Sequence, residues 1–225
     1  PPPPSTTSAP VATVRSATLV LSPRGILPPV SLPAPPVAVA SVIGLVVAAR
    51  RVSPIPPLRL AGSFYVNTVR NTPLAVLMVL FYFALPDVGI LYSAYVSAVI
   101  VLSAYTGSFV AEVIRAGINS VARGQAEAAR ALGLTYPQVL RIVILPQALR
   151  AVIAPLGSVF IALIKNSALA NLISVTELAG TAERLINDTA QPIPLFVAAA
   201  LAYLALTIPS GIVLGRIERR FAIKR

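Results

Sequence analysis

The few residues of this chain that could do chemistry include a charged, alanine-rich stretch, QAEAARALGLTYPQVLRIVILP, at residues 125–146. Its charges are Glu127, Arg130 and Arg141. Each would cost about 2.5–3.5 kcal/mol at the centre of a membrane-spanning helix. Small Ala128 next to the Glu127 carboxylate permits close approach of another protein. We therefore interpret the stretch as a docking surface for a cytosolic partner.

Most enzyme chemistry is excluded by the residue types. The chain has no cysteine and no histidine, which removes thiol nucleophiles, disulfides, imidazole bases and the usual zinc ligands. Its lysines are Lys165 and Lys224, and neither follows a glycine-rich loop, so we expect no phosphate cradle of the Walker type. We predict no catalytic residue, no metal and no cofactor. If ATP powers the protein, another subunit must hydrolyse it.

The composition predicts an integral membrane protein. Of 225 residues, 56% are hydrophobic and 11% charged, and the mean hydropathy is +0.84, which is too apolar for an ordinary soluble domain. The net charge of +11 does not indicate nucleic-acid binding, because the basic residues are not interleaved with aromatic ones. We expect lipid as the surroundings.

The elements that position the charged stretch are apolar helices, so the predicted class is all-α. Three uncharged or nearly uncharged runs are long enough to span a bilayer: 88–111, 151–176 and 190–215. Residues 72–85 are short for a span, and we expect that helix to recruit residues before Arg70. The first helix is doubtful, because prolines leave only 37–49 as a clean helical run.

The arginines predict the orientation, since cytoplasmic loops collect Arg and Lys. Five spans with the N-terminus outside and the C-terminus cytosolic place three basic segments on one side: Arg50, Arg51, Arg59 and Arg70; then Arg115, Arg123, Arg130, Arg141 and Arg150; then Arg216, Arg219, Arg220, Lys224 and Arg225. The other loops hold Asp87, Glu177, Glu183 and Asp188, with Arg184 as their only basic residue.

The sequence also divides into three segments. Residues 1–36 hold 11 of the 22 prolines and should be extended, without the pattern of a normal secretory signal peptide. Residues 37–217 form the expected membrane domain, with a cytosolic loop at 116–148. Residues 218–225 form a basic cytosolic tail.

Inside that loop the pattern predicts two helices with a sharp break. Gly124 opens a helix over about 125–132, and Gly133 has the position of a left-handed helix end. Thr135 and Gln138 then have the spacing of a capping box. The second helix leads back to the membrane at Leu145–Pro146.

These residues carry a family resemblance. Glu127-Ala128-Ala129, Gly133 and the following VILP resemble the EAA loop of permease subunits of bacterial ABC importers. GQAEAARALGL, ILPQALR, NTVRNTPL and KNSALA are similar to the polar amino-acid branch, and most to glutamate permeases. The match covers about Val37 to the C-terminus.

The resemblance implies a type I ABC importer in the plasma membrane, working by alternating access. Its partners would be a cytosolic ABC ATPase dimer, a second permease subunit (a copy or a paralogue) and an extracytoplasmic solute-binding protein. The loop would be the coupling helix, with these residues contacting the ATPase: Glu127, Ala128, Ala129, Arg130, Gly133, Leu145 and Pro146. The alternative is a plain solvated loop.

Polar residues within or beside the predicted apolar helices are candidates for a substrate path. Lys165, Asn166 and Ser167 interrupt the fourth span. Either they line the substrate path, or they are structural and the Lys165 side chain extends to a membrane interface. Glu112 and Arg115 have the spacing of a helical ion pair, which is either structural or a gate. Asn71 and Thr72 belong to a polar cluster before Pro73.

Two other functions remain open. An ATP-independent carrier or channel would need intramembrane carboxylates, and Glu112 is the only candidate. An inactive remnant acting as a scaffold would follow if the first span failed to insert.

Overall fold

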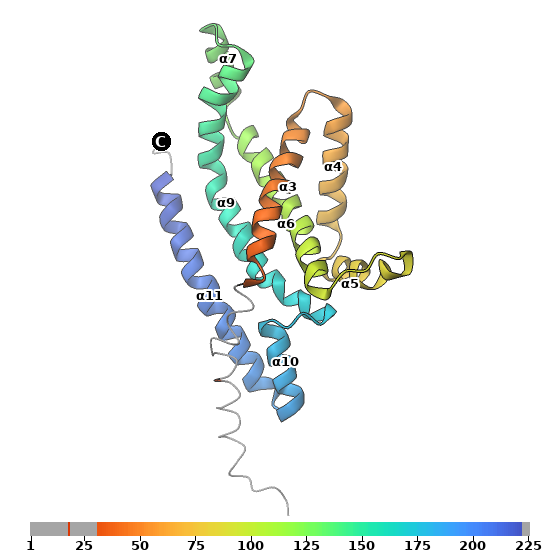
Figure 1. Cartoon of the computed structure of the whole chain (residues 1–225). Helices are drawn as coiled ribbons and strands as arrows, with labels where there is room; N and C mark the ends of the chain where they lie inside the picture. Colours follow the sequence, from red (N-terminus) through yellow and green to blue (C-terminus); the bar gives the residue numbers. More distant parts are fainter. Residues whose placement is uncertain (1–17, 19–30, 222–225) are drawn as a thin grey trace, which may run out of the picture. The chain divides into compact units, whose positions relative to one another are not determined.

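The computed structural model describes Thr18 and residues 31–221, and these residues form helices without a strand (Figure 1). Four of the helices in this part of the chain are long and apolar enough to cross a membrane, and a broken pair would make a fifth span. The all-α prediction is therefore confirmed. Most of the predicted proline-rich segment 1–36, and residues 222–225 of the basic tail, lie outside the described residues.

The first spanning helix is longer than its uncharged, proline-free core. Helix α3 runs over Ala34–Val52, whereas the sequence predicts an uninterrupted helix only over 37–49. Pro35 and Pro36 fall in its first turn, where a missing N–H costs no helical hydrogen bond. At about 1.5 Å per residue the 19 residues reach roughly 28 Å, close to the hydrocarbon thickness.

The second predicted span is two helices. Helix α4 covers Pro56–Asn71 and α5 covers Leu74–Ala84, so our expectation that one helix would continue through Arg70 is wrong. Pro73 lies at the break. It lacks a backbone donor and pushes Thr72 into extended geometry, with φ −96° and ψ 130°.

The third span is shifted along the chain. We expected 88–111, but α6 is Ala94–Asn119. A short 3-10 helix, η1 (Pro86–Val88), ends at left-handed Gly89, and the Ser93 hydroxyl accepts from the N–H of Val96 at 3.3 Å to start α6. The helix continues past Glu112, whose carboxylate is paired with Arg115.

The fourth span is part of one long helical run of 38 residues, Tyr136–Ile173. It joins α8 (Tyr136–Gln138), a π-helical segment η2 (Val139–Ile144), α9 (Leu145–Asn166) and a 3-10 segment η3 (Ser167–Ile173). We predicted 151–176 with a loop helix before it. The run is not interrupted at Pro146, which lies in the first turn of α9. The last span is α11, Pro192–Phe221, against a predicted 190–215.

The chain forms two compact units, each with its own packing. The described part of unit 1 contains Leu74–Leu102 and Leu163–Pro209, and its core joins α10 (Leu178–Thr189) to the start of α11. Unit 2 contains Val37–Pro73, Ser103–Ala162 and the end of α11. Its core brings α3, α4 and α6 together through Val47, Ala48, Val66 and Ala111.

Candidate functional site

The predicted docking surface is a short helix in unit 2, α7 (Arg123–Ala131), that folds back on the start of the Tyr136–Ile173 run (Figure 1). Ala129 and Val139 are its buried anchors, at 5% and 3% exposure. Glu127, Ala128 and Arg130 are exposed. The apolar side of α7 therefore packs on η2, and its charged side is presented outward.

The break after α7 has the geometry that its glycine predicts. Gly133 has φ +81°, in the left-handed region that glycine enters without a Cβ clash. Its N–H donates to the carbonyl of Arg130 at 2.9 Å, and the N–H of Leu134 donates to that of Ala129 at 3.2 Å. These bonds satisfy carbonyls that a helix end leaves free.

The predicted capping box at the next helix is confirmed. The N–H of Thr135 donates to Oε1 of Gln138 at 2.8 Å, and Pro137 lies in the first turn. Leu145 and Pro146, the other predicted coupling residues, are exposed at the start of α9. Backbone hydrogen bonds on one side of the break and the capping box on the other thus define its conformation.

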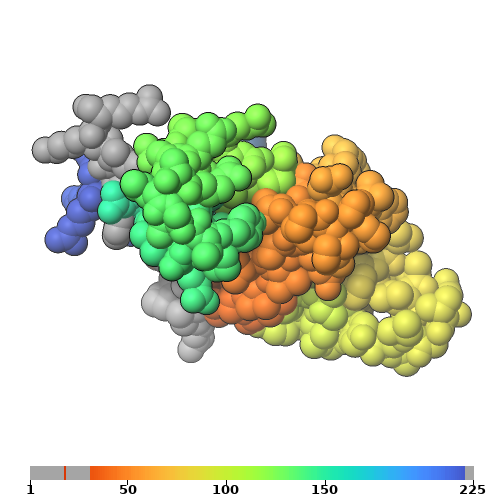
Figure 2. Space-filling view, turned by 90° about the horizontal axis from the view of Figure 1, so that it is seen from above, coloured from red at the N-terminus to blue at the C-terminus, as the bar shows by residue number. Residues whose placement is uncertain are grey.

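Two exposed apolar residues flank the break and were missed. Leu132 is 84% exposed and Tyr136 is 70% exposed. Figure 2 shows the face on which this loop (green) lies. The signal was in the sequence, because large apolar residues next to a left-handed glycine in a polar loop have no local reason to be there.

A hollow of about 450 Å³ lies at the base of α7. It is formed where the end of α6, the following turn and η2 meet, and both polar and apolar groups line it: Ile118, Asn119, Val121, Ala122, Arg123, Ala126 and Ile144. The hollow therefore lies beside the predicted docking surface, with Ala126 of α7 in its lining.

The predicted pair of Glu112 and Arg115 is confirmed, and two arginines join it. Arg115 Nη2 donates to Glu112 Oε1 at 2.7 Å, and Arg51 Nη1 donates to Oε2. Arg70 Nη1 lies 3.5 Å from the same Oε2 and stacks over the Phe109 ring, 4.9 Å from its centroid. One carboxylate of α6 therefore ties α3, α4 and α6 together.

Two of the other predicted path residues, Thr72 and Ser167, make local hydrogen bonds. In unit 2, Asn71 is exposed and the Thr72 hydroxyl donates to the carbonyl of Thr68 at 2.8 Å. In unit 1, Ser167 is fully buried and donates to the carbonyl of Ile164 at 2.7 Å. Lys165 is exposed and Asn166 half-buried at the point where α9 becomes 3-10 helix.

Unit 1 holds a buried carboxylate that sequence reasoning passed over. Glu177 is fully buried at the N-terminus of α10, where its Oε1 accepts from the N–H of Gly180 at 2.9 Å. Its Oε2 accepts from the hydroxyl of Tyr203 at 2.6 Å. Burial raises the pKa of Glu177 above its ordinary value, although these hydrogen bonds oppose the rise. The signal was an acidic N-cap before an apolar pattern.

Comparison with known proteins defines the class. Residues 40–223 match the family of binding-protein-dependent transport system inner membrane components, and the chain belongs to that family. It is 40% identical over 179 residues to a probable glutamine ABC transporter permease protein of Bacillus subtilis, covering 80% of this chain and 83% of the relative. It is 39% identical over 197 residues to a glutamate transport system permease protein of Corynebacterium efficiens, covering 82% and 86%.

Solved structures agree with this assignment. The crystal structure of an amino acid ABC transporter with histidines superimposes with a TM-score of 0.88 at 32% identity, over 93% of this chain and 97% of that one. The MetNI methionine ABC transporter gives 0.73 at 23% identity, over 89% and 95%, and supports the fold alone. The chain is a multi-pass membrane permease subunit with the type I ABC importer fold, from an amino-acid transport family.

Proposed function

We propose that this chain imports a polar amino acid by alternating access, driven by ATP that a separate ABC ATPase dimer hydrolyses. The observation that carries the proposal is α7, a charged helix that ends at the hydrogen-bonded break at Gly133 and whose apolar side packs on η2. A carboxylate and an arginine presented outward, with exposed Leu132 beside them, suit a groove on a soluble protein. Coupling is assigned to Glu127, Ala128, Ala129, Arg130, Gly133, Leu145 and Pro146.

Membership of the family supports the other proposed partners. A second permease subunit, either a copy or a paralogue, would complete the membrane pathway, and an extracytoplasmic solute-binding protein would deliver the substrate. The arginine distribution supports an N-terminus outside and a C-terminus in the cytosol. The substrate path is assigned to Glu112, Asn71 and Thr72 of unit 2 and to Lys165, Asn166 and Ser167 of unit 1.

A glutamate-like substrate is the finer part of the proposal. It is supported by relatives whose names specify glutamate or glutamine transport, and another relative at 37% identity is an L-cystine transport permease. Competition for uptake separates these substrates. Glutamate should compete at least tenfold better than cystine, and the opposite order would overturn the assignment.

Reconstitution tests the function. Proteoliposomes with this permease, its ATPase and its binding protein should accumulate the amino acid only when ATP is supplied on the ATPase side. Uptake that persists without the ATPase would favour the ATP-independent carrier. Absence of uptake from a correctly inserted, complete complex would favour an inactive scaffold.

A further inference from the structure

The ion cluster around Glu112 carries more positive charge than it neutralises. Its three guanidinium groups, from Arg51, Arg70 and Arg115, share one carboxylate. The cluster therefore has a net charge of +2. Such an excess is costly in a membrane protein, where low dielectric surroundings strengthen repulsion between like charges.

The cluster also has more hydrogen-bond donors than acceptors. The Nε atoms of Arg51 and Arg115 are both buried, and neither has an acceptor among the described residues. The Arg51 side chain is only 8% exposed. An unmet donor on a buried charged group costs more than a neutral one, so these two N–H groups point to a further acceptor.

The described residues offer no second carboxylate for this role. Glu127 and Glu218 are the other acidic residues of unit 2, and in the described part of the chain the ion pairs of these arginines all end on Glu112. Phe109 occupies the face of the Arg70 guanidinium and leaves its edge donors available. Exposed Arg50 and Arg59, on the same helices, add positive charge.

We propose that Arg51, Arg70 and Arg115, held in place by Glu112, form a binding site for an oxyanion. Guanidinium groups match the paired oxygens of a carboxylate or a phosphate. The site is reachable, because the side chains of Arg70 and Arg115 are 37% and 36% exposed. Glu112 is thus a positioning residue that keeps the three arginines converged.

Two sources can supply this oxyanion. One is the phosphate of an anionic phospholipid, which basic clusters at a membrane surface attract. The other is the α-carboxylate of an amino acid in transit, a source that rests on the proposed function. The oxyanion site itself does not depend on the proposed function, so the experiment measures binding and not uptake.

The experiment is thermal unfolding of the purified permease–ATPase complex in detergent. One arm compares added phosphatidylglycerol with zwitterionic phosphatidylcholine. The other compares L-glutamine with L-glutaminamide, which lacks the α-carboxylate. Either phosphatidylglycerol or L-glutamine should raise the Tm by about 2–4 °C relative to its control. The compound that does so identifies the source of the oxyanion.

Variants separate a site from a general charge effect. Arg70→Gln and Arg115→Gln alter partly exposed side chains and should remove the shift. Arg115→Lys keeps the positive charge but lacks the planar guanidinium, and it should retain part of the shift in Tm. Arg216→Gln, an exposed arginine at the end of α11, should leave it unchanged. A shift in neither arm, or equal shifts in wild type and Arg70→Gln, would overturn the proposal.

Discussion

The hydroxyl of Tyr203 on α11 donates a 2.6 Å hydrogen bond to Oε2 of Glu177, the N-cap residue of α10. The other oxygen of the same carboxylate accepts from the N–H of Gly180. Around this pair, Leu178, Leu195 and Ala202 are fully buried. Glu177 therefore fastens two helices of unit 1 from a position without solvent contact.

The stability of the protein should depend on the protonation of Glu177. Because burial raises its pKa, the folded protein binds this proton more tightly than the unfolded chain, where glutamate titrates near about pH 4.3. The stabilisation is fully present below that pH and is lost as the pH rises through the raised folded value. The Tm in detergent should fall over this window.

Glu177→Gln should abolish that part of the pH dependence, because the amide cannot titrate. Glu218→Gln changes an exposed residue of α11 and should leave the fall in place. Identical pH profiles for Glu177→Gln and the wild type would show that this carboxylate is not the source.

The break after α7 should depend on the backbone of Gly133. A Cβ at Gly133 or at Gly124 would meet nothing within 4 Å, but only Gly133 has a positive φ, at +81°. Gly133→Ala should therefore cost about 1–2 kcal/mol, whereas Gly124→Ala should be neutral or stabilising within α7. Thermal unfolding of the two variants measures this, and equal effects would show that the left-handed conformation is not required.

Close packing of α6 on α9 should require Gly117. A Cβ there would overlap Cγ1 of Val152 and lie 3.2 Å from the carbonyl oxygen of Ala148. Gly117→Ala should destabilise unit 2 by about 1–3 kcal/mol, measured by thermal unfolding. Gly215→Ala, where the Cβ meets open space, is the control. Adding Val152→Ala should recover part of the loss, and no recovery would place the strain elsewhere.

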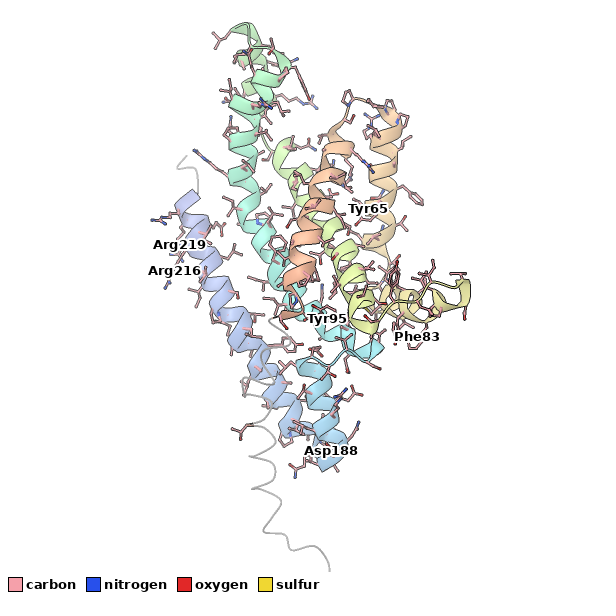
Figure 3. The ribbon with its side chains drawn as sticks, in the orientation of Figure 1. Tyr65, Phe83, Tyr95, Asp188, Arg216 and Arg219 are labelled. Carbon is pink, nitrogen blue, oxygen red and sulfur yellow. The ribbon has the colours of Figure 1, made fainter. Side chains whose placement is uncertain are left out.

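The orientation can be read by cysteine labelling, because the wild-type chain has no cysteine and gives a blank background. Gln125→Cys places a thiol on exposed α7, and Asp188→Cys places one near the exposed end of α10 (Figure 3). In intact cells, a membrane-impermeant maleimide should label only Asp188→Cys. Gln125→Cys should react after permeabilisation, and the reverse pattern would invert the proposed topology.

Local chemistry made the break after α7 predictable. Gly133, Thr135 and Gln138 act within one or two turns, so their spacing alone predicted the left-handed break and the capping box. The ends of the spans were less predictable. Apolar content did not distinguish the bend at Pro73 from the uninterrupted helical run through Pro146, where the π-helical segment η2 directly precedes α9.

Long-range pairing was not visible in the sequence. Arg51 lies 61 residues before Glu112, so only the local partner, Arg115, could be predicted. Glu177 was read as a loop charge because its burial depends on Tyr203, 26 residues later. The roles of both carboxylates depend on tertiary contacts, which the periodicity of the sequence does not reveal.

In the proposed function, α7 couples ATP hydrolysis to transport. The most direct test of this coupling is the initial rate of ATP-dependent amino-acid uptake in proteoliposomes containing Glu127→Arg, with Gly124→Ala as the folded control. Glu127→Arg reverses an exposed charge and should leave the Tm of the permease within a few degrees. Glu127→Arg should lose at least nine-tenths of uptake while Gly124→Ala keeps it, and wild-type uptake by Glu127→Arg would show that α7 does not couple the two processes.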